Sequence, residues 1–237
     1  MKRRYDTILF DADGTLFDFD RSEANAIGEV LSICGLPVND ETVELYHRIN
    51  DAEWKALERG ETTREKLKVD RFAKLIAALS ERGVTASSTA KEMCDLYVDR
   101  LSQQCIMIDG AVEVCERLVR THSLHIITNG ITHVQTSRFS RSPIMKFMGN
   151  MFISEQMGAV KPERRYFELV FEALGITPDE AKERCIVVGD SLTSDIMGAV
   201  NAGLDSCWYN PRGIEPGAVL PTYTISSLQE LYGILGG

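Results

Sequence analysis

Short apolar segments alternate along the chain with segments of helical periodicity. Continuous apolar runs of three to six residues, as found here, are typical of strands buried on both faces of a parallel sheet. The helices between them begin with capping signals, as at Thr177-Pro178-Asp179-Glu180 and at the box Ser227…Glu230. The predicted strands are 5–10, 124–128, 151–153, 185–188, 206–209 and 223–225, and the main helices between them are 111–120, 132–141, 164–174 and 192–201. This alternation predicts a doubly wound, Rossmann-like α/β sheet.

One long stretch breaks the alternation. Residues 17–105 contain no convincing strand pattern and predict successive amphipathic helices instead, over 21–34, 40–59, 63–81 and 88–103. Breaks fall at Gly35-Leu36-Pro37, Gly60 and Gly83. We therefore predict two domains: an α/β core made of residues 1–16 and 106–237, and an inserted all-helical domain made of residues 17–105.

Composition narrows the class of protein. The 237 residues are 44% apolar and 26% charged, which is ordinary for a globular protein, and the net charge is −9. An acidic surface disfavours nucleic acid and anionic lipid as partners. No apolar run is long enough to span a membrane, and Asp11 cuts short the apolar stretch after the basic start, unlike a signal peptide. We expect a cytoplasmic protein, as a monomer or small homo-oligomer.

The cysteines and histidines fit that compartment. Six cysteines are scattered along the chain with no C-x-x-C pair, and the four histidines are not spaced with them as zinc ligands. We therefore predict reduced thiols in apolar surroundings rather than disulfides or a zinc site.

Acidic side chains follow two of the predicted strands. Asp11 and Asp13 end the first strand, with Gly14 permitting a sharp turn behind them, and Asp190 ends the fourth, with Asp195 five residues later. Local turn hydrogen bonds and helix capping would account for each pair separately. Ligands of open α/β sheets bind beyond the carboxyl ends of the strands, however, and carboxylates gathered there repel one another unless a cation separates them. Oxygen ligands of this kind favour Mg²⁺.

Two further segments lie at strand ends or helix starts. Thr128-Asn129-Gly130 follows the second strand, where a hydroxyl, an amide and backbone N–H groups could cradle an anion. Lys161 stands immediately before Pro162 at the start of a helix. Taken alone, Thr128 would be an ordinary helix N-cap residue, and Lys161 would be a solvent-exposed side chain on the surface. Beside the acidic strand ends, both are candidates for binding a phosphate group.

These motifs, in this order, resemble the haloacid dehalogenase superfamily of phosphohydrolases over the whole chain. They are Asp11-x-Asp13-Gly14-Thr15, Thr128, Lys161 and Gly189-Asp190 followed by Asp195. The resemblance implies that the helical insertion is the cap domain of subclass I members. The segments Ile153-Ser154-Glu155-x-x-Gly158, 195–203 and Trp208-Tyr209-Asn210 resemble the pyrimidine-nucleotidase branch, from which Pro143 and Gly149 depart.

The resemblance implies a role for each motif residue. Asp11 is the nucleophile that forms an aspartyl-phosphate, and Asp13 protonates the leaving alkoxide and then accepts a proton from water. Mg²⁺ is held by Asp11, Asp190 and the backbone carbonyl of Asp13, while Asp195 binds it through water or orients Lys161. The phosphate-binding residues are Thr128, Asn129 and Lys161.

The resulting interpretation is a Mg²⁺-dependent phosphatase of small phosphomonoesters, with a pyrimidine nucleoside 5′-monophosphate as substrate. Keeping Asp13 favours an ester whose leaving oxygen needs a proton, unlike the halide of the related dehalogenases. The alternatives are a sugar-phosphate or phosphoglycolate phosphatase, a β-phosphoglucomutase, and a non-catalytic binding protein on the same scaffold. Aromatic residues of the helical insertion could stack a base or form its core: Tyr46, Trp54, Phe72 and Tyr97.

Overall fold

A computed structural model describes residues 5–236, which fall into two compact units. The α/β unit takes in the chain up to Asp18 and from Ile106 onward, and the helical unit is Phe19–Cys105. The first boundary lies two residues after the predicted one. The reason is local: Phe17 forms a bridge with Met107, and the Asp18 N–H donates to the Ile106 carbonyl at 2.9 Å, so both residues belong to the α/β unit.

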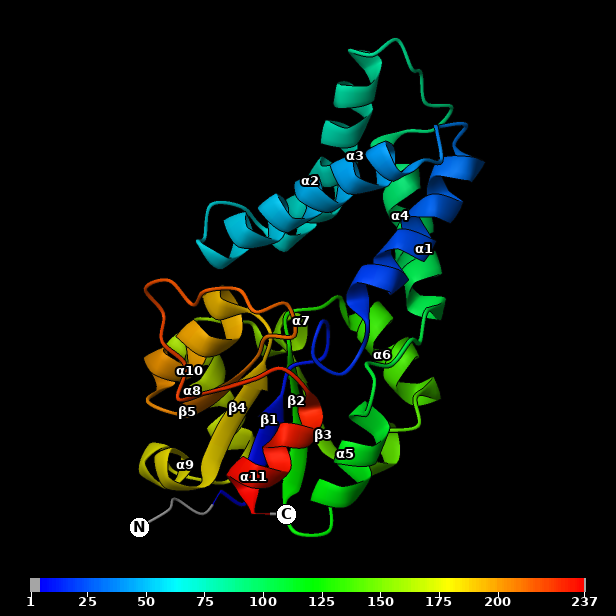
Figure 1. Ribbon diagram of the computed structural model, residues 1–237. Helices are drawn as coiled ribbons and strands as arrows, with labels where there is room; N and C mark the ends of the chain where they lie inside the picture. Colours follow the sequence, from blue (N-terminus) through cyan, green and yellow to red (C-terminus); the bar gives the residue numbers. More distant parts are fainter. Residues whose placement is uncertain (1–4, 237) are drawn as a thin grey trace. The chain divides into compact units, whose positions relative to one another are not determined.

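The α/β unit is built on one parallel sheet, which confirms the predicted fold class. Within the described residues the sheet has six strands in the order β3-β2-β1-β4-β5-β6 (Figure 1). The strands are β1 (Thr7–Phe10), β2 (Ser123–Thr128), β3 (Met148–Ile153), β4 (Cys185–Gly189), β5 (Asp205–Tyr209) and β6 (Tyr223–Ile225). The central strand β1 pairs with β2 and β4, so Phe10 lies opposite both Ile126 and Val188. The segments that follow β1, β2 and β4 therefore all begin at the same edge of the sheet.

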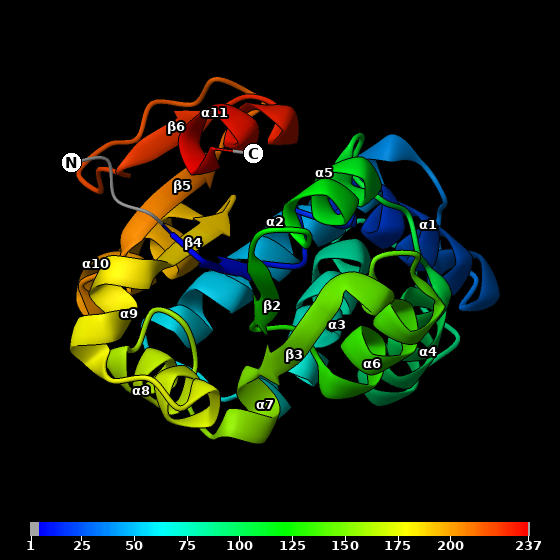
Figure 2. The same cartoon turned by 90° about the horizontal axis from the view of Figure 1, so that it is seen from below.

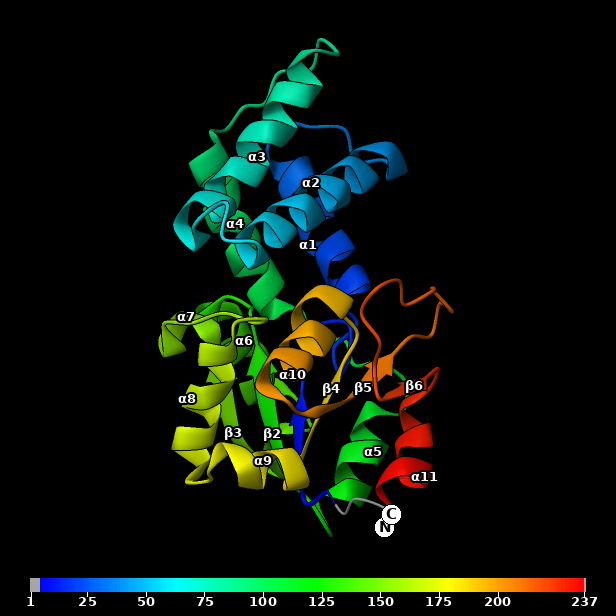
Figure 3. The same cartoon turned by 90° about the vertical axis from the view of Figure 1, so that its left-hand side faces the viewer.

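Helices cover both faces of this sheet. Figure 2 shows α8, α9 and α10 on one side and α5, α6 and α11 on the other, and in Figure 3 the first group faces the viewer. The helical segments are α5 (Ala111–Leu118), α6 (Thr132–Arg141), η1 (Met145–Phe147), α7 (Ser154–Met157), α8 (Arg164–Leu174), α9 (Pro178–Arg184), η2 (Leu192–Ile196), α10 (Met197–Ala202), η3 (Leu228–Glu230) and α11 (Leu231–Leu235). Because both faces are covered, the inner strands are apolar along their length.

On one face of the sheet, side chains from three neighbouring strands pack into a single hydrophobic core. Leu9, Ile127 and Val187 point from neighbouring strands into a single buried cluster with Phe167 and Val170 of α8. Their chain neighbours point to the opposite face, since successive side chains of a strand alternate. The central strands are thereby fixed on both sides, which gives the residues at their carboxyl ends a rigid support.

The helical unit consists of four helices in its described residues: α1 (Phe19–Ile33), α2 (Asp40–Glu58), α3 (Arg64–Ser80) and α4 (Ala90–Gln103). Tyr46, Phe72 and Tyr97 are fully buried and pack together with ring centroids 5.3 to 5.5 Å apart. These three rings are core residues and are not available to stack a base. Trp54 is half-buried, and the Arg64 guanidinium lies 5.8 Å from its ring centroid.

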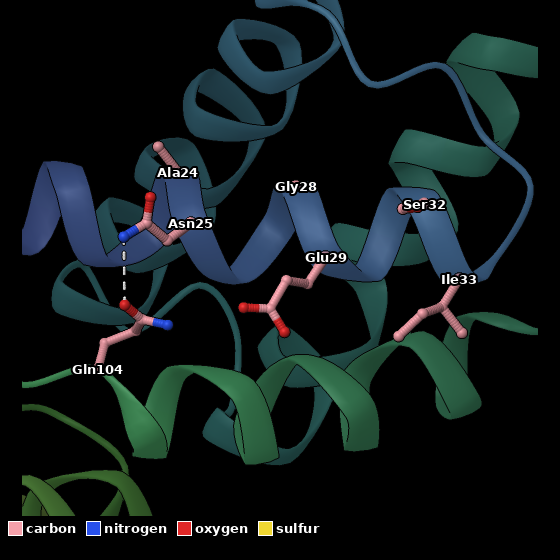
Figure 4. A pocket seen from close by; sticks show the side chains of 7 residues that line it. All are labelled: Ala24, Asn25, Gly28, Glu29, Ser32, Ile33 and Gln104. Carbon is pink, nitrogen blue, oxygen red and sulfur yellow. Dashed lines mark hydrogen bonds between the residues drawn. The ribbon is translucent and has the colours of Figure 1, made fainter.

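The helical unit also carries a surface pocket. It is lined by residues of α1 and by Gln104, and Asn25 donates to the Gln104 side chain at 3.2 Å across it (Figure 4). None of the predicted site residues lines this pocket.

Two further features concern the chain as a whole. No helix among residues 5–236 combines the length and apolarity needed to cross a bilayer. All six cysteines are free thiols, and Cys105 is the one that is only partly buried. The absence of disulfides within the described residues agrees with the scattered spacing of these cysteines.

Candidate active site

Three of the predicted metal-binding carboxylates meet at the edge of the sheet. Asp11 follows β1, and its N–H donates to the Val188 carbonyl of β4 at 2.8 Å. Asp190 follows β4, and Asp195 lies in the π-helical turn η2 just after it. One carboxylate oxygen of each of Asp11, Asp190 and Asp195 lies within 4.8 Å of the other two. Parallel pairing of β1 and β4 therefore brings together acids that are about 180 residues apart in sequence.

Two glycines make room for these carboxylates. Gly14 has φ +85°, and a Cβ atom there would lie 2.3 Å from Asp190 Oδ2. A Cβ atom at Gly189 would lie 2.3 Å from Asp195 Oδ2. A side chain at either position would displace a carboxylate, so the glycines of both motifs serve the site as well as the turn.

Asp190 and Asp195 are each held by neighbours. The Thr15 hydroxyl donates to Asp190 Oδ1 at 3.3 Å, and the Trp208 indole N–H donates to the Asp190 backbone carbonyl at 2.8 Å. The Ser191 N–H donates to Asp195 Oδ2 at 3.1 Å. These bonds orient the two acids before any ligand arrives, which is the preorganisation that a binding site needs.

Lys161 lies between two of the acids. Its Nζ donates to Asp11 Oδ1 and to Asp195 Oδ1, both at 2.6 Å, and to the Ile127 carbonyl at 3.0 Å, and the residue is 1% exposed. Burial disfavours its ammonium form, but the two carboxylates outweigh that penalty and raise the pKa of Lys161. Lys161 is therefore a fixed, fully charged group beside Asp11, and Asp195 orients it.

Asn129 holds the segment that carries Lys161. Its Nδ2 donates to the Lys161 carbonyl at 2.8 Å, and its Oδ1 accepts from the Lys161 N–H at 2.9 Å. The amide thus satisfies both backbone groups of one residue, as a neighbouring strand would. The structure places the Asn129 side chain on Lys161, so its predicted contact with phosphate would come from its backbone.

Thr128 is anchored at the end of β2. Its N–H donates to the Tyr166 hydroxyl at 3.1 Å, and that hydroxyl donates to the Phe152 carbonyl at 2.7 Å. The Gly130 N–H donates to Thr128 Oγ1 at 3.0 Å. Thr128 is 1% exposed, and it is not an N-cap, because α6 begins at Thr132 with Ile131 as its N-cap residue. Binding of phosphate by the Thr128 hydroxyl stays a prediction.

The charges at this edge do not balance. Three carboxylates face the single ammonium of Lys161 in a buried setting. Burial and the neighbouring Asp195 raise the pKa of Asp11 well above its usual range, although Lys161 opposes the shift. Burial and Asp195 also raise the pKa of Asp190, to about 7. Buried carboxylates with this excess of negative charge fit a divalent cation that prefers oxygen ligands.

Asp13 has a different environment. Its side chain is 23% exposed and turns toward helix α6, where Oδ2 accepts from Gln135 Nε2 and Oδ1 accepts from Arg138 Nη1, each at 2.5 Å. The Asp13 carboxylate is not in the group of acids that could share a cation, so only its backbone carbonyl is left as a metal ligand. The two acids of the first motif are thus separated into different surroundings.

Gln135 and Arg138 are functional candidates that the sequence interpretation missed. Both are buried on α6, beside Val134 and Phe139 on the same inward stripe. The available signal was their spacing: two polar side chains at i and i+3 on the apolar face of a helix require buried partners. The sequence does not say which residue that partner is.

Comparison with known proteins places the chain in a family. The model of the haloacid dehalogenase-like hydrolases matches residues 5–203. YfnB from Bacillus subtilis (strain 168) is 37% identical over 98% of this chain and 96% of its own. The crystal structure of YfnB bound to magnesium superimposes with a TM-score of 0.89, covering 99% of this chain and 100% of that one.

Two relatives with named substrates also match nearly the full length. The pyrimidine 5′-nucleotidase PynA from Streptococcus pneumoniae (strain ATCC BAA-255 / R6) is 33% identical over 98% of this chain and 95% of its own. The pyrimidine 5′-nucleotidase YjjG from Escherichia coli (strain K12) is 31% identical over 98% of each chain.

Proposed function

Because the chain belongs to the haloacid dehalogenase-like hydrolases and is an enzyme of that family, we propose that it is a Mg²⁺-dependent phosphatase acting through an aspartyl-phosphate. One observation carries the proposal: Asp11 is fixed 2.6 Å from Lys161 at the edge where Asp190 and Asp195 converge. A carboxylate nucleophile needs an adjacent cation to approach an anionic phosphate, and this pair supplies both.

The two acids of the first motif have different roles in the reaction: Asp11 is the nucleophile, and Asp13 is the general acid and base. An oxygen of Asp11 attacks phosphorus, the bond from phosphorus to the ester oxygen breaks, and Asp13 gives its proton to the departing alkoxide. Water then attacks the same phosphorus, Asp13 takes a proton from it, and the bond to Asp11 breaks to release phosphate and restore the carboxylate. Lys161 balances charge on the phosphoryl oxygens, and Thr128 with the backbone of Asn129 holds them.

Asp11 and Asp190 are the side chains that would hold the cation, with the backbone carbonyl of Asp13, while Asp195 would bind it through water or orient Lys161. Bound there, Mg²⁺ would offset the negative charge that this edge carries in excess and stabilise charge on the phosphoryl group. The fixed positions of Asp190 and Asp195, each held by its own hydrogen bonds, support this assignment.

We propose pyrimidine nucleoside 5′-monophosphates as the substrate class. Support comes from PynA and YjjG, both named as pyrimidine 5′-nucleotidases, at 33% and 31% identity over nearly complete chains. The segments shared with that branch in the sequence add to it. Asp13 supports an ester with an oxygen leaving group, because a nucleoside alkoxide must be protonated as it leaves.

A panel of phosphomonoesters tests both levels of the proposal. Phosphate release and kcat/KM are measured in Mg²⁺ for UMP, dTMP, glucose 6-phosphate, β-glucose 1-phosphate and phosphoglycolate. UMP and dTMP should be hydrolysed best, and Asp11→Asn should lower the rate by at least about 10⁴-fold while its circular dichroism stays unchanged.

The outcomes separate the alternatives. A non-nucleotide preferred by tenfold or more would discard the nucleotidase assignment and leave the phosphatase. Isomerisation of β-glucose 1-phosphate would establish a mutase. Hydrolysis that survives Asp11→Asn within about tenfold of the wild type would place the nucleophile elsewhere.

A further inference from the structure

The carboxylate of Asp13 is gripped by two buried donors from one helix. We propose that Gln135 and Arg138 form a clamp, the Gln135–Arg138 clamp, that positions Asp13 for proton transfer to the leaving group. The inference rests on the proposed function, in which Asp13 is the general acid and base. Gln135 and Arg138 act through Asp13 and are positioning residues.

The geometry of the clamp fixes the orientation of the carboxylate. Gln135 Nε2 binds Oδ2 and Arg138 Nη1 binds Oδ1, so each oxygen has its own donor. The two donors stand three residues apart on α6, where side chains share one face of the helix. A carboxylate held at both oxygens cannot rotate about its Cβ–Cγ bond without breaking a hydrogen bond, so the orientation of the Asp13 carboxyl group is set.

The donors are themselves immobilised. Arg138 is 0% exposed, and its guanidinium lies 4.4 Å from the ring centroid of Phe17, which packs edge-on against Phe139 at 4.8 Å. Phe17 also forms a bridge with Asp13 itself. The clamp therefore belongs to the packed interior of the α/β unit, unlike an exposed ion pair whose side chains move freely.

Gly130 belongs to the same arrangement. A Cβ atom at this position would lie 2.0 Å from Gln135 Nε2 and 2.8 Å from its Cδ. The φ of Gly130 is not in the left-handed region, so conformation alone does not demand glycine here. The glycine of Thr128-Asn129-Gly130 thus leaves space for the Gln135 amide beside Asp13. The motif that follows β2 serves the phosphate site and the clamp together.

The chemical consequence depends on the leaving group. A nucleoside alkoxide leaves poorly unless it is protonated, whereas p-nitrophenolate is a weak base and leaves without help. A general acid contributes about 10²- to 10⁴-fold when its proton is needed. Loss of the clamp should therefore slow the alkyl ester much more than the aryl ester. Damage to the fold or to the metal site would slow both equally.

The test uses Arg138→Met and Gln135→Met, with Arg141→Met as the matched control. Arg141 lies in the last turn of the same helix, is exposed, and binds Ser137 instead of Asp13. The measured quantity is kcat/KM in Mg²⁺ for dTMP and for p-nitrophenyl phosphate. This ratio covers the steps up to departure of the leaving group and excludes hydrolysis of the phosphorylated Asp11.

We expect Arg138→Met and Gln135→Met to lower kcat/KM for dTMP by at least tenfold, and for p-nitrophenyl phosphate by less than about threefold. Arg141→Met should change neither. Equal losses on the two substrates, or no loss, would overturn the clamp. If Arg138→Met does not fold, as judged by circular dichroism and thermal unfolding, the decision passes to Gln135→Met, which keeps the buried cation.

Asp13→Asn separates failure of the clamp from failure of the proposed function. If the wild type hydrolyses neither ester, the proposed function fails. If it does, and Asp13→Asn spares the aryl ester while slowing dTMP, Asp13 is the acid. Clamp variants without that selectivity then overturn the clamp alone. If dTMP is not a substrate, the alkyl phosphate that the wild type hydrolyses fastest takes its place.

Discussion

Both units of the molecule bury a cationic side chain among polar partners, but the balance of charge differs. In the helical unit, Arg71 donates to Asn50 Oδ1 at 2.8 Å, and Asn50 donates to Glu23 Oε1 at 2.5 Å. The other oxygen of Glu23 lies 2.5 Å from His47 Nδ1. The Arg71 guanidinium also lies 4.7 Å from the ring centroid of Tyr97. One carboxylate is thus shared by a histidine and, through an amide, by an arginine.

In the α/β unit the proportion is reversed: Asp11, Asp190 and Asp195 lie together, and the single ammonium of Lys161 pairs with Asp11 and Asp195. The surplus positive charge of the helical network lies on His47, whose side chain is 40% exposed to water and has Asp20 and Glu44 nearby, so this network needs no ligand to offset its charge. In a network with an excess of negative charge the carboxylates repel one another, and binding a cation reduces that repulsion. The comparison teaches that an excess of negative charge, and not the burial of charge alone, distinguishes the candidate active site.

Among the variants that compare the two units, replacing Lys161, the central cation of the α/β unit, should have the largest effect. Lys161→Met should lower kcat by about 10²- to 10³-fold, the typical size of one preorganised charge-stabilising group. Steady-state hydrolysis of the best substrate measures it. Arg71→Met is the counterpart in the helical unit and should leave kcat within about threefold. A loss below about fivefold in Lys161→Met would remove that residue from the reaction and erase the contrast.

The excess negative charge can be probed without turnover. Mg²⁺ should raise the Tm of the wild type, since a ligand that binds only the folded state at 100 times its Kd stabilises by about 2.7 kcal/mol. Asp190→Asn should abolish this shift, and Asp179→Asn, an exposed acid of α9, should keep it. Chelator should also remove activity, which Mg²⁺ but not Ca²⁺ restores. An unchanged shift in Asp190→Asn would show that Mg²⁺ binds elsewhere.

Disrupting the buried network of Arg71, Asn50 and Glu23 should change the stability of the protein and not its activity. Arg71→Met should lower the free energy of unfolding by about 1–3 kcal/mol, because Asn50 loses a buried donor. Chemical denaturation followed by circular dichroism measures the change. Arg82→Met is the matched control: Arg82 pairs with Glu41 at 2.6 Å on the exposed surface, where such pairs contribute about 0–1 kcal/mol. Equal effects of the two variants would mean that the buried network stabilises no more than a surface pair.

The smallest effect should be the pH dependence of the unfolding free energy that His47 causes. The hydrogen bond to Glu23 raises the pKa of His47 to about 9 from 6.5, with further contributions from Asp20 and Glu44. A histidine with a raised pKa stabilises the folded state fully below pH 6.5, and the gain is lost as pH rises through 9. The difference in unfolding free energy between wild type and His47→Gln should shrink over that window. A difference independent of pH would show that His47 is not charged in the folded protein.

Much of the fold could be predicted because it rests on local patterns. The helices at Thr132–Arg141 and Arg164–Leu174 match their predicted bounds, as does the strand at Tyr223–Ile225. The segment predicted as one helix over 192–201 instead begins as the π-helical turn Leu192–Ile196. The wider turn carries Asp195, whose carboxylate bonds to Lys161 and to the Ser191 N–H. Such turns often occur at functional sites, and no local propensity announces them.

The sequence by itself determined which carboxylates stand at strand ends and that Gly14 permits a turn behind the first pair, because strand periodicity and turn chemistry are properties of neighbouring residues. Only the tertiary structure decided the partners. Lys161 meets Asp11 across 150 residues, and Arg138 meets Asp13 across 125. These meetings depend on the strand order and on which helix covers which face. Nothing in a short segment encodes either, since they minimise the free energy of the whole packed domain.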